Sequence, residues 1–177
     1  MKKLLLLSML LCGFMAQAST MYEEAYPDLN NDNLRDKIEI TKEDDGSASL
    51  NFYLAKAKYE YNLVSSARFN VREAYELPHM AIDEKRQIII EQTVATGDTT
   101  TVITSTFEFR KDDLHLLQKA LTVISFDDRT VTTTNYVKGE VTVQKIKNYS
   151  DIGPKKLLKK IKKGAPALGE LANLSGL

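Results

Sequence analysis

Apolar and polar residues alternate along much of the middle of the chain. Every second residue from Leu50 to Leu54 is apolar, and a similar alternation returns over residues 59–63. A period of two is typical of a strand with one buried face. Asp44-Asp45-Gly46 is a turn signal, so we expect a hairpin from Lys37–Lys42 into Ser47–Ala55.

Five more β-rich runs follow, and short polar breaks separate them. They are Gln87–Val94, Thr99–Arg110, Leu114–Ser125, Thr130–Lys138 and Val141–Lys147. Thirteen of the fifteen threonines lie between residues 93 and 142, and threonine suits a half-exposed pleated surface better than a helix. We therefore predict a mainly β fold built from antiparallel sheets.

Two segments have a less decisive pattern. Leu114, Leu117 and Leu121 lie at helical spacing, so Asp112–Ala120 would also fit one short helix. We favour a strand there because the segment lies between two β-rich runs. Tyr75–Lys85 contains a proline and is expected to be an excursion or loop.

The segment Pro154–Lys163 has a different character. Leu157, Leu158 and Ile161 stand at positions i, i+1 and i+4 among six lysines. Proline suits the first turn of a helix and Gly164 its end, so we predict a short C-terminal amphipathic helix. Such a helix either docks on the sheet with its lysines in solvent or lies on an anionic membrane surface.

The first eighteen residues have the pattern of a secretory signal peptide. Two lysines precede the apolar run Leu4–Met15, and Ala16-Gln17-Ala18 supplies the small residues that a signal peptidase needs. The run is too short to cross a bilayer, which takes about 20 apolar residues. We predict that residues 1–18 are removed, that 19–150 form the β domain, that 151–177 form a basic helical tail, and that the protein is periplasmic or secreted.

Removal of this segment changes the charge and the cysteine content. The whole chain has 24 basic and 24 acidic residues, and the loss of two lysines leaves a net charge of −2. Such a balance argues against a nucleic-acid-binding surface. Cys12, the single cysteine, is lost as well, so we expect no disulfide. Lipidation of Cys12 is an alternative, but Leu11 stands where such sites normally have a small residue.

An acidic stretch precedes the first strand of the predicted hairpin. Side-chain oxygens fall at alternate positions on Asp28, Asn30 and Asp32, with Asp36 further on, and the Leu34 carbonyl can add another. Calcium binds six to eight such oxygens, and three carboxylates would offset its charge. We therefore predict one structural Ca²⁺. The alternative is an Asx-rich turn that caps the strand without metal.

The same stretch fits an EF-hand less well. Glu39 falls at the twelfth position, as an EF-hand requires, but Asn33 stands where the invariant glycine belongs. Pro27 precedes the loop and a predicted strand follows it, so the flanking helices are missing. We expect a loop that leads directly into the strand, with Ile38 and Ile40 facing the core and Glu39 facing outward.

Catalysis has little support in the residue pattern. The only histidines are His79 and His115, too few for a zinc site without cysteine. The sequence has no G-x-S-x-G, no H-E-x-x-H and no phosphate-binding glycine loop. A glycosidase needs only two carboxylates, so an unrecognised hydrolase stays an alternative. We predict that the protein is not an enzyme.

Residues 26–38 resemble a known calcium loop. Their D-x-N-x-D-x-x-x-D pattern is similar to the loop of FG-GAP/VCBS-type β-propeller repeats, although Asn33 stands where glycine is common. The resemblance implies that the loop binds calcium and that the ion has a structural role. The residues implied as ligands are Asp28, Asn30, Asp32, Leu34 and Asp36.

Two later segments extend the resemblance over roughly residues 26–147. Thr104–Leu117 and Thr132–Val141 are similar to the F-x-F/Y-x-x-x-x-x-x-L hairpin and the T-x-N-Y-x-x-G turn of small secreted bacterial proteins with one such loop. A relative of that family is a periplasmic inhibitor of lysozyme-type muramidases, built as a two-bladed pseudo-propeller. The expected architecture is therefore a pseudo-propeller or a sandwich-like arrangement of sheets.

The resemblance implies a function in binding. We expect an exported, calcium-stabilised protein that binds a protein partner, with a cell-wall hydrolase or toxin as the partner and inhibition or immunity as the outcome. The alternative is a non-enzymatic envelope module that binds glycan or a membrane surface through the lysines of residues 154–163.

Overall fold

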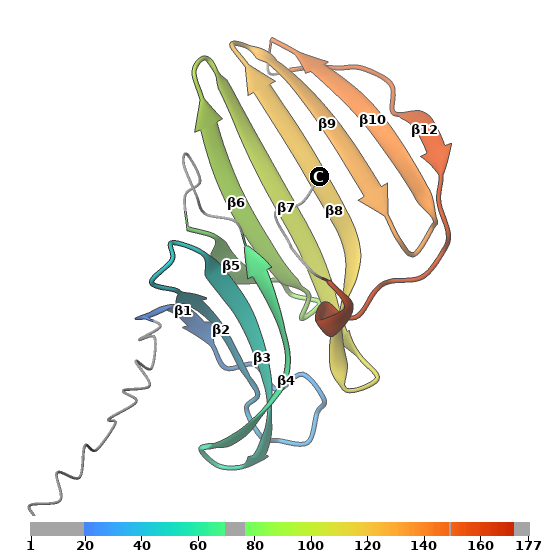
Figure 1. The fold of residues 1–177 in the computed structure, drawn as a ribbon. Helices are drawn as coiled ribbons and strands as arrows, with labels where there is room; N and C mark the ends of the chain where they lie inside the picture. The colour runs from blue at the N-terminus through green and yellow to red at the C-terminus, as the bar shows by residue number, and fades with distance from the viewer. Residues whose placement is uncertain (1–19, 70–76, 149, 172–177) are drawn as a thin grey trace, which may run out of the picture.

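The computed structural model describes residues 20–69, 77–148 and 150–171. Within these residues, twelve strands form two antiparallel sheets in a sandwich-like arrangement, as Figure 1 shows. The predicted mainly β class with antiparallel sheets is confirmed. The predicted signal peptide, residues 1–18, lies outside the described residues.

The smaller sheet has four strands in the order β1-β2-β3-β4. Their bounds are β1 Thr20–Ala25, β2 Lys37–Lys42, β3 Ala48–Ala57 and β4 Glu60–Phe69. Strands β2 and β3 form the predicted hairpin, and Lys42 pairs with Ala48 across the predicted turn. Strand β1 was not expected from the sequence, and it pairs with β2 along the far edge.

The larger sheet has eight strands, with β5 at one edge and β10 paired with both β11 and β12 at the other. Their bounds are β5 His79–Ile82, β6 Ile88–Thr96, β7 Thr99–Arg110, β8 Asp113–Ser125, β9 Asp128–Asn135, β10 Glu140–Lys147, β11 Asp151–Ile152 and β12 Lys156–Lys160. The five predicted β-rich runs are therefore confirmed as β6 to β10. The helical alternative for 112–120 is wrong, because this segment pairs with β7 throughout and with β9 from Gln118 on.

The polar break between β7 and β8 forms a two-residue turn. Lys111 and Asp112 have φ values of +50° and +63°, which is the left-handed pair that a type I′ hairpin turn requires. This turn matches the right-handed twist of the two strands, so it fixes their register. Phe107 consequently pairs with Leu116, and both side chains are buried in the core.

The hydrophobic core lies between the four-stranded sheet and one end of the eight-stranded sheet. Ile38 and Ile40 are fully buried on β2, as predicted. The larger sheet adds buried residues from the start of β6, the end of β7 and the start of β8, including Ile90 and Phe107. Phe52 packs edge-on against Phe109, with ring centroids 5.8 Å apart. These contacts join the two layers, because each sheet buries one face against the other.

Glu39 faces outward from β2, as predicted, but its side chain is only 7% exposed. The Tyr53 hydroxyl donates a hydrogen bond to its carboxylate, and Lys37 forms an ion pair with it. Burial and this hydrogen bond raise the pKa of Tyr53, so the hydroxyl remains a donor. Neighbouring long side chains thus cover the outer face.

The prediction of an amphipathic helix over residues 154–163 is also wrong. Residues Lys156–Lys160 form strand β12, which pairs with β10 so that Val143 faces Lys156 and Glu140 faces Lys160. The edge of β10 offers backbone hydrogen bonds to a neighbouring segment, whereas a ten-residue helix with three apolar residues is marginal in water. The helical turn that the structure does contain in this region is the 3-10 turn Leu168–Glu170, with Leu168 buried in the core.

The far ends of strands β6 to β10 extend beyond the four-stranded sheet, as Figure 1 shows. From Leu117 to Ser125 every residue of β8 is partly exposed, and the same holds for β9 from Arg129 to Asn135 except for Thr133. We call this region the open end, and the core-bearing region the packed end. Across residues 20–69, 77–148 and 150–171, no helix has the length and apolar character that a membrane crossing requires.

Candidate functional site

The predicted calcium loop connects β1 to β2. The Asp36 backbone N–H donates to the Pro27 carbonyl at 2.8 Å and so closes the loop at its base. Asn31 and Asn33 have left-handed φ values of +61° and +65°. Asparagine is one of the few residues besides glycine that adopts this conformation readily. Asn33 therefore adopts without glycine a backbone conformation that favours glycine.

Asp36 fastens the loop to the smaller sheet. Its carboxylate is fully buried and accepts hydrogen bonds from the N–H groups of Leu29 at 2.9 Å and Ala55 at 3.1 Å. Burial raises the pKa of Asp36, two backbone hydrogen bonds oppose that rise, and the charges of Asp32 and Asp28 add to it. The three predicted acidic ligands thus repel one another across the loop.

Three of the predicted ligands are joined by hydrogen bonds across the loop. The Asn30 side chain accepts from the Asp32 N–H at 3.1 Å, and its amide donates to Asp32 Oδ2 at 2.8 Å. The Leu34 N–H donates to Asp32 Oδ1 at 2.7 Å. Asp28 Oδ2 accepts from the Asn33 N–H at 3.2 Å, and Asp28 Oδ1 is buried without a hydrogen-bond partner.

The fit of this loop to calcium is partial. An unpartnered buried carboxylate oxygen on Asp28 and mutual repulsion of three acids are features that a cation would relieve. Against this, the Asp36 carboxylate is turned to the backbone of Leu29 and Ala55. In the part of the chain that the structure describes, no three acidic, histidine or cysteine side chains gather as a metal-binding group.

Arg86 is a residue of this region that the sequence analysis missed. It lies in the turn between β5 and β6, and its guanidinium donates to the Asp28 carbonyl at 3.2 Å and to the Asn31 side chain. Its φ value is +60°. Arg86 therefore brings a positive charge from the larger sheet to the loop, and no sequence signal links it to residues more than fifty positions away.

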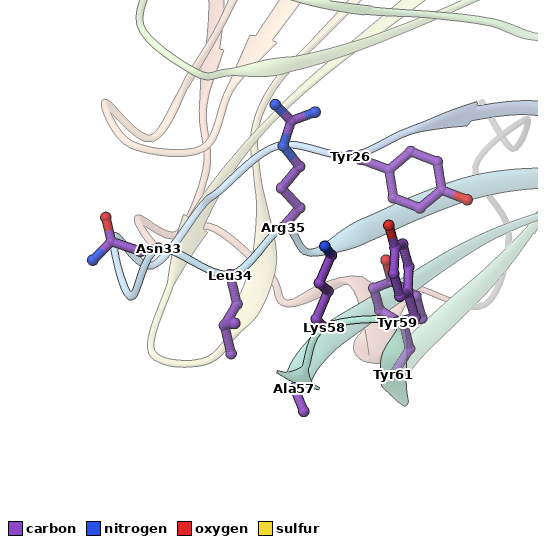
Figure 2. A pocket seen from close by; sticks show the side chains of 8 residues that line it. All are labelled: Tyr26, Asn33, Leu34, Arg35, Ala57, Lys58, Tyr59 and Tyr61. Atoms are coloured by element: carbon purple, nitrogen blue, oxygen red, sulfur yellow. The ribbon is translucent and has the colours of Figure 1, made fainter.

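A cavity lies beside the loop, as Figure 2 shows. Its volume is about 670 Å³, within the range of small-molecule sites. It forms between the end of the loop and the tip of the β3–β4 hairpin. The residues that line it are Tyr26, Asn33, Leu34, Arg35, Ala57, Lys58, Tyr59 and Tyr61.

The two histidines lie on different strands. His115 is in β8, where its Nδ1 is within 2.9 Å of the Ala165 carbonyl and so helps to hold the segment that follows β12. His79 begins β5, and its ring centroid lies 6.2 Å from that of Tyr22. Each histidine thus has a local packing or hydrogen-bonding role.

The chain matches no protein-family model, no curated protein and no solved structure. The resemblance to FG-GAP/VCBS-type proteins therefore stays a prediction from the sequence.

Proposed function

We propose that the protein is an exported, calcium-stabilised binding protein that recognises another macromolecule, and that a lysozyme-type cell-wall hydrolase is its partner. The observation that carries the proposal is the open end of the eight-stranded sheet, where β8 from Leu117 to Ser125 and β9 from Arg129 to Asn135, except Thr133, are partly exposed. The family resemblance supplies the choice of partner.

The open end has the properties of a rigid contact surface. Cross-strand pairs such as Thr101–Val123 and Val102–Thr122 place β-branched side chains on its two opposite faces. These side chains hold few rotamers, so binding costs little conformational entropy. Backbone pairing is continuous there, which leaves the faces rather than the strand edges for contact. A protein–protein interface of standard size buries about 800 Å² of accessible surface on each partner.

Calcium would act on the loop rather than on the contact surface. Asp28, Asn30, Asp32 and Asp36 would hold the ion together with the Leu34 carbonyl, as the spacing of these residues predicts. Its charge would offset the repulsion that raises the pKa of Asp36. The chain's own hydrogen bonds at Asp36 already tie the loop to β3, so an ion would strengthen an existing attachment.

The test is complex formation with muramidases. The purified protein should co-elute with a lysozyme-type hydrolase and slow lysis of a cell-wall substrate. Val123→Arg and Thr122→Arg, which alter opposite faces of the open end, should differ in their effect, because one partner occupies one face. Leu63→Arg, at a 56% exposed position of β4, is the control. Failure of every lysozyme type and cognate toxin to bind would reject the proposal.

Strand β12 supports a second candidate, an envelope module that binds an anionic surface. All five of its residues are exposed, and Leu157 and Leu158 expose 53% and 58% of their surface beside the lysines. Exposed leucines flanked by lysines suit a layer of anionic headgroups, where each lysine contributes about 1 kcal/mol.

Vesicle sedimentation separates this candidate from the first. Lys156→Glu with Lys159→Glu should release the protein from phosphatidylglycerol vesicles and leave hydrolase binding unchanged. Equal sedimentation of the wild type with anionic and zwitterionic vesicles would rule the second candidate out.

A further inference from the structure

We propose that the cavity between the loop and the β3–β4 hairpin binds an acidic sugar, that is, a pyranose ring bearing a carboxylate. The site uses no residue of the open end and needs no metal ion. It therefore goes beyond the proposed function, and either one can fail without the other.

Three tyrosines give the cavity its aromatic surface. Tyr26 and Tyr61 have ring centroids 6.2 Å apart and planes tilted by 46°, so they form two walls that meet at an angle. Tyr59 lies at the hairpin tip and exposes 78% of its surface. The face of an aromatic ring is electron-rich, and it attracts the C–H groups that line one side of a pyranose.

The polar edges of these tyrosines suit hydroxylated ligands. Within the described residues, the hydroxyls of Tyr59 and Tyr61 form no hydrogen bond, so both can pair with sugar hydroxyls. The Tyr26 hydroxyl donates to Glu24 at 2.8 Å, and this raises its pKa to about 12. All three rings therefore combine an apolar face with a group that can hydrogen bond.

Two cations line the same cavity, and none of the lining residues is acidic. Arg35 and Lys58 are both exposed and form no ion pair with a described residue. Lys58 lies 5.2 Å from the centre of the Tyr59 ring, and both side chains point from the hairpin toward the segment carrying Tyr26 and Arg35 (Figure 2). Figure 2 shows the Arg35 side chain extending away from the hairpin, so Lys58 is the cation that faces the tyrosines. Its ammonium can donate charge-assisted hydrogen bonds to a carboxylate, which makes an anionic sugar a better ligand than a neutral one.

The backbone at the hairpin tip keeps Tyr59 in this position. Tyr59 has a φ value of +68°, a conformation in which glycine or asparagine is the usual turn residue. Ala57 pairs with Glu60 on either side, and a register shift between Ala55 and Ala57 sets the angle of the tip. The chain thus carries a bulky aromatic ring where local conformation disfavours it, and the ring faces the cavity.

Calorimetric titration of the purified protein with two sugars tests the proposal. N-acetylmuramic acid carries a carboxylate that N-acetylglucosamine lacks, and the two otherwise share their ring. We expect a Kd of about 0.1–1 mM for the acid, the range for an open pocket and about twenty non-hydrogen atoms. The affinity for the neutral sugar should be lower by a factor of about ten or more, since this sugar lacks the charged hydrogen bonds. Glucuronic acid against glucose repeats the comparison and distinguishes cell-wall sugars from other acidic glycans.

Variants locate the site. Lys58→Ala should weaken binding of the acid about tenfold and leave the neutral sugar unchanged. Tyr59→Ala should weaken both sugars, because it removes a stacking surface. Tyr22→Ala and Lys138→Ala are the controls, since Tyr22 is as exposed as Tyr26, at 40% against 39%, and lies outside the cavity.

Three results would overturn the proposal. The first is no saturable binding of either acidic sugar, and the second is equal affinity for the acidic and neutral sugars. The third is a Lys58→Ala variant that binds the acid as well as Lys138→Ala does. Folding of each variant is checked by circular dichroism, and Tyr59→Phe, which keeps the ring, should retain stacking if Tyr59→Ala is unstable.

Discussion

The two ends of the eight-stranded sheet share one hydrogen-bonding pattern and differ in what surrounds their side chains. At the packed end, Ile90 and Phe107 are almost completely buried against the smaller sheet. At the open end, Thr101 of β7 pairs with Val123 of β8, and both side chains are only partly buried. Strand pairing continues through both ends. Burial of apolar side chains therefore concentrates stability at one end and leaves the other available for contacts.

The largest expected effect comes from a core substitution at the packed end. Phe107→Ala should lower the free energy of unfolding by about 3–5 kcal/mol, because it leaves a cavity between the sheets. Val123→Ala, its counterpart at the open end, should cost no more than about 1 kcal/mol. Urea denaturation measures both. Equal losses would contradict the division into a packed and an open end.

Asp36 should matter next, since it joins the loop to the packed end. Asp36→Ala leaves the N–H groups of Leu29 and Ala55 without their acceptor, and we expect a loss of about 2–3 kcal/mol. The loss should persist in EDTA, because these hydrogen bonds do not depend on an ion. A loss that disappears in EDTA would assign Asp36 to the metal instead.

Removal of calcium should destabilise the packed end as well. If calcium is present at a hundred times its Kd, EDTA should lower the free energy of unfolding by about 2.7 kcal/mol. Asp32→Ala should abolish this sensitivity. Hydrogen exchange should then quicken in β2 and β3 and stay unchanged in the open ends of β8 and β9. If EDTA leaves the melting temperature of the wild-type protein unchanged, the protein does not bind calcium.

The smallest effect is expected at Lys119, near the inner limit of the open end. Lys119 faces Ser105 across the β7–β8 pair, and burial lowers its pKa. A lowered pKa in the folded protein means that the charged amine costs stability at neutral pH, and that stability rises as the pH increases through the folded pKa. Lys119→Met should remove this rise and change stability by about 1 kcal/mol or less. Urea denaturation at pH 7 and pH 10 measures the free energy of unfolding of both proteins. If the wild type and Lys119→Met show the same pH dependence, burial of the Lys119 charge does not destabilise the protein.

Local signals were sufficient to predict most strands. The alternation around Phe52 and the polar turns at Asp44–Gly46 and Lys111–Asp113 fix hairpins between neighbouring segments. In such hairpins the partner strand lies a few residues away, so pattern and turn chemistry act together.

Elements that depend on distant partners could not be predicted in the same way. The spacing of Leu157, Leu158 and Ile161 predicted a helix, but residues 156–160 pair with the edge of β10 as a strand. The strand pattern predicted the outward direction of Glu39, but its burial could not be predicted because it depends on Tyr53 of the neighbouring strand.

The candidate sites follow the same division. The composition of the loop drew attention to Asp28 and Asp32, and both take part in its hydrogen bonds. The attachment of Asp36 to Ala55 depends on the fold, as does the reach of Arg86 to the loop. The tyrosine cavity could not be predicted, because the pairing of all four strands of the smaller sheet brings the loop beside the β3–β4 hairpin tip.

The lysines of β12 have a consequence for how copies of the protein meet. Every residue of this strand is exposed, and three of the five are lysines. Two sheets that joined through this strand would bring like charges into contact, which opposes strand-to-strand polymerisation. Charge repulsion therefore disfavours association of two copies through this edge. The faces of the sheet stay accessible to a different molecule.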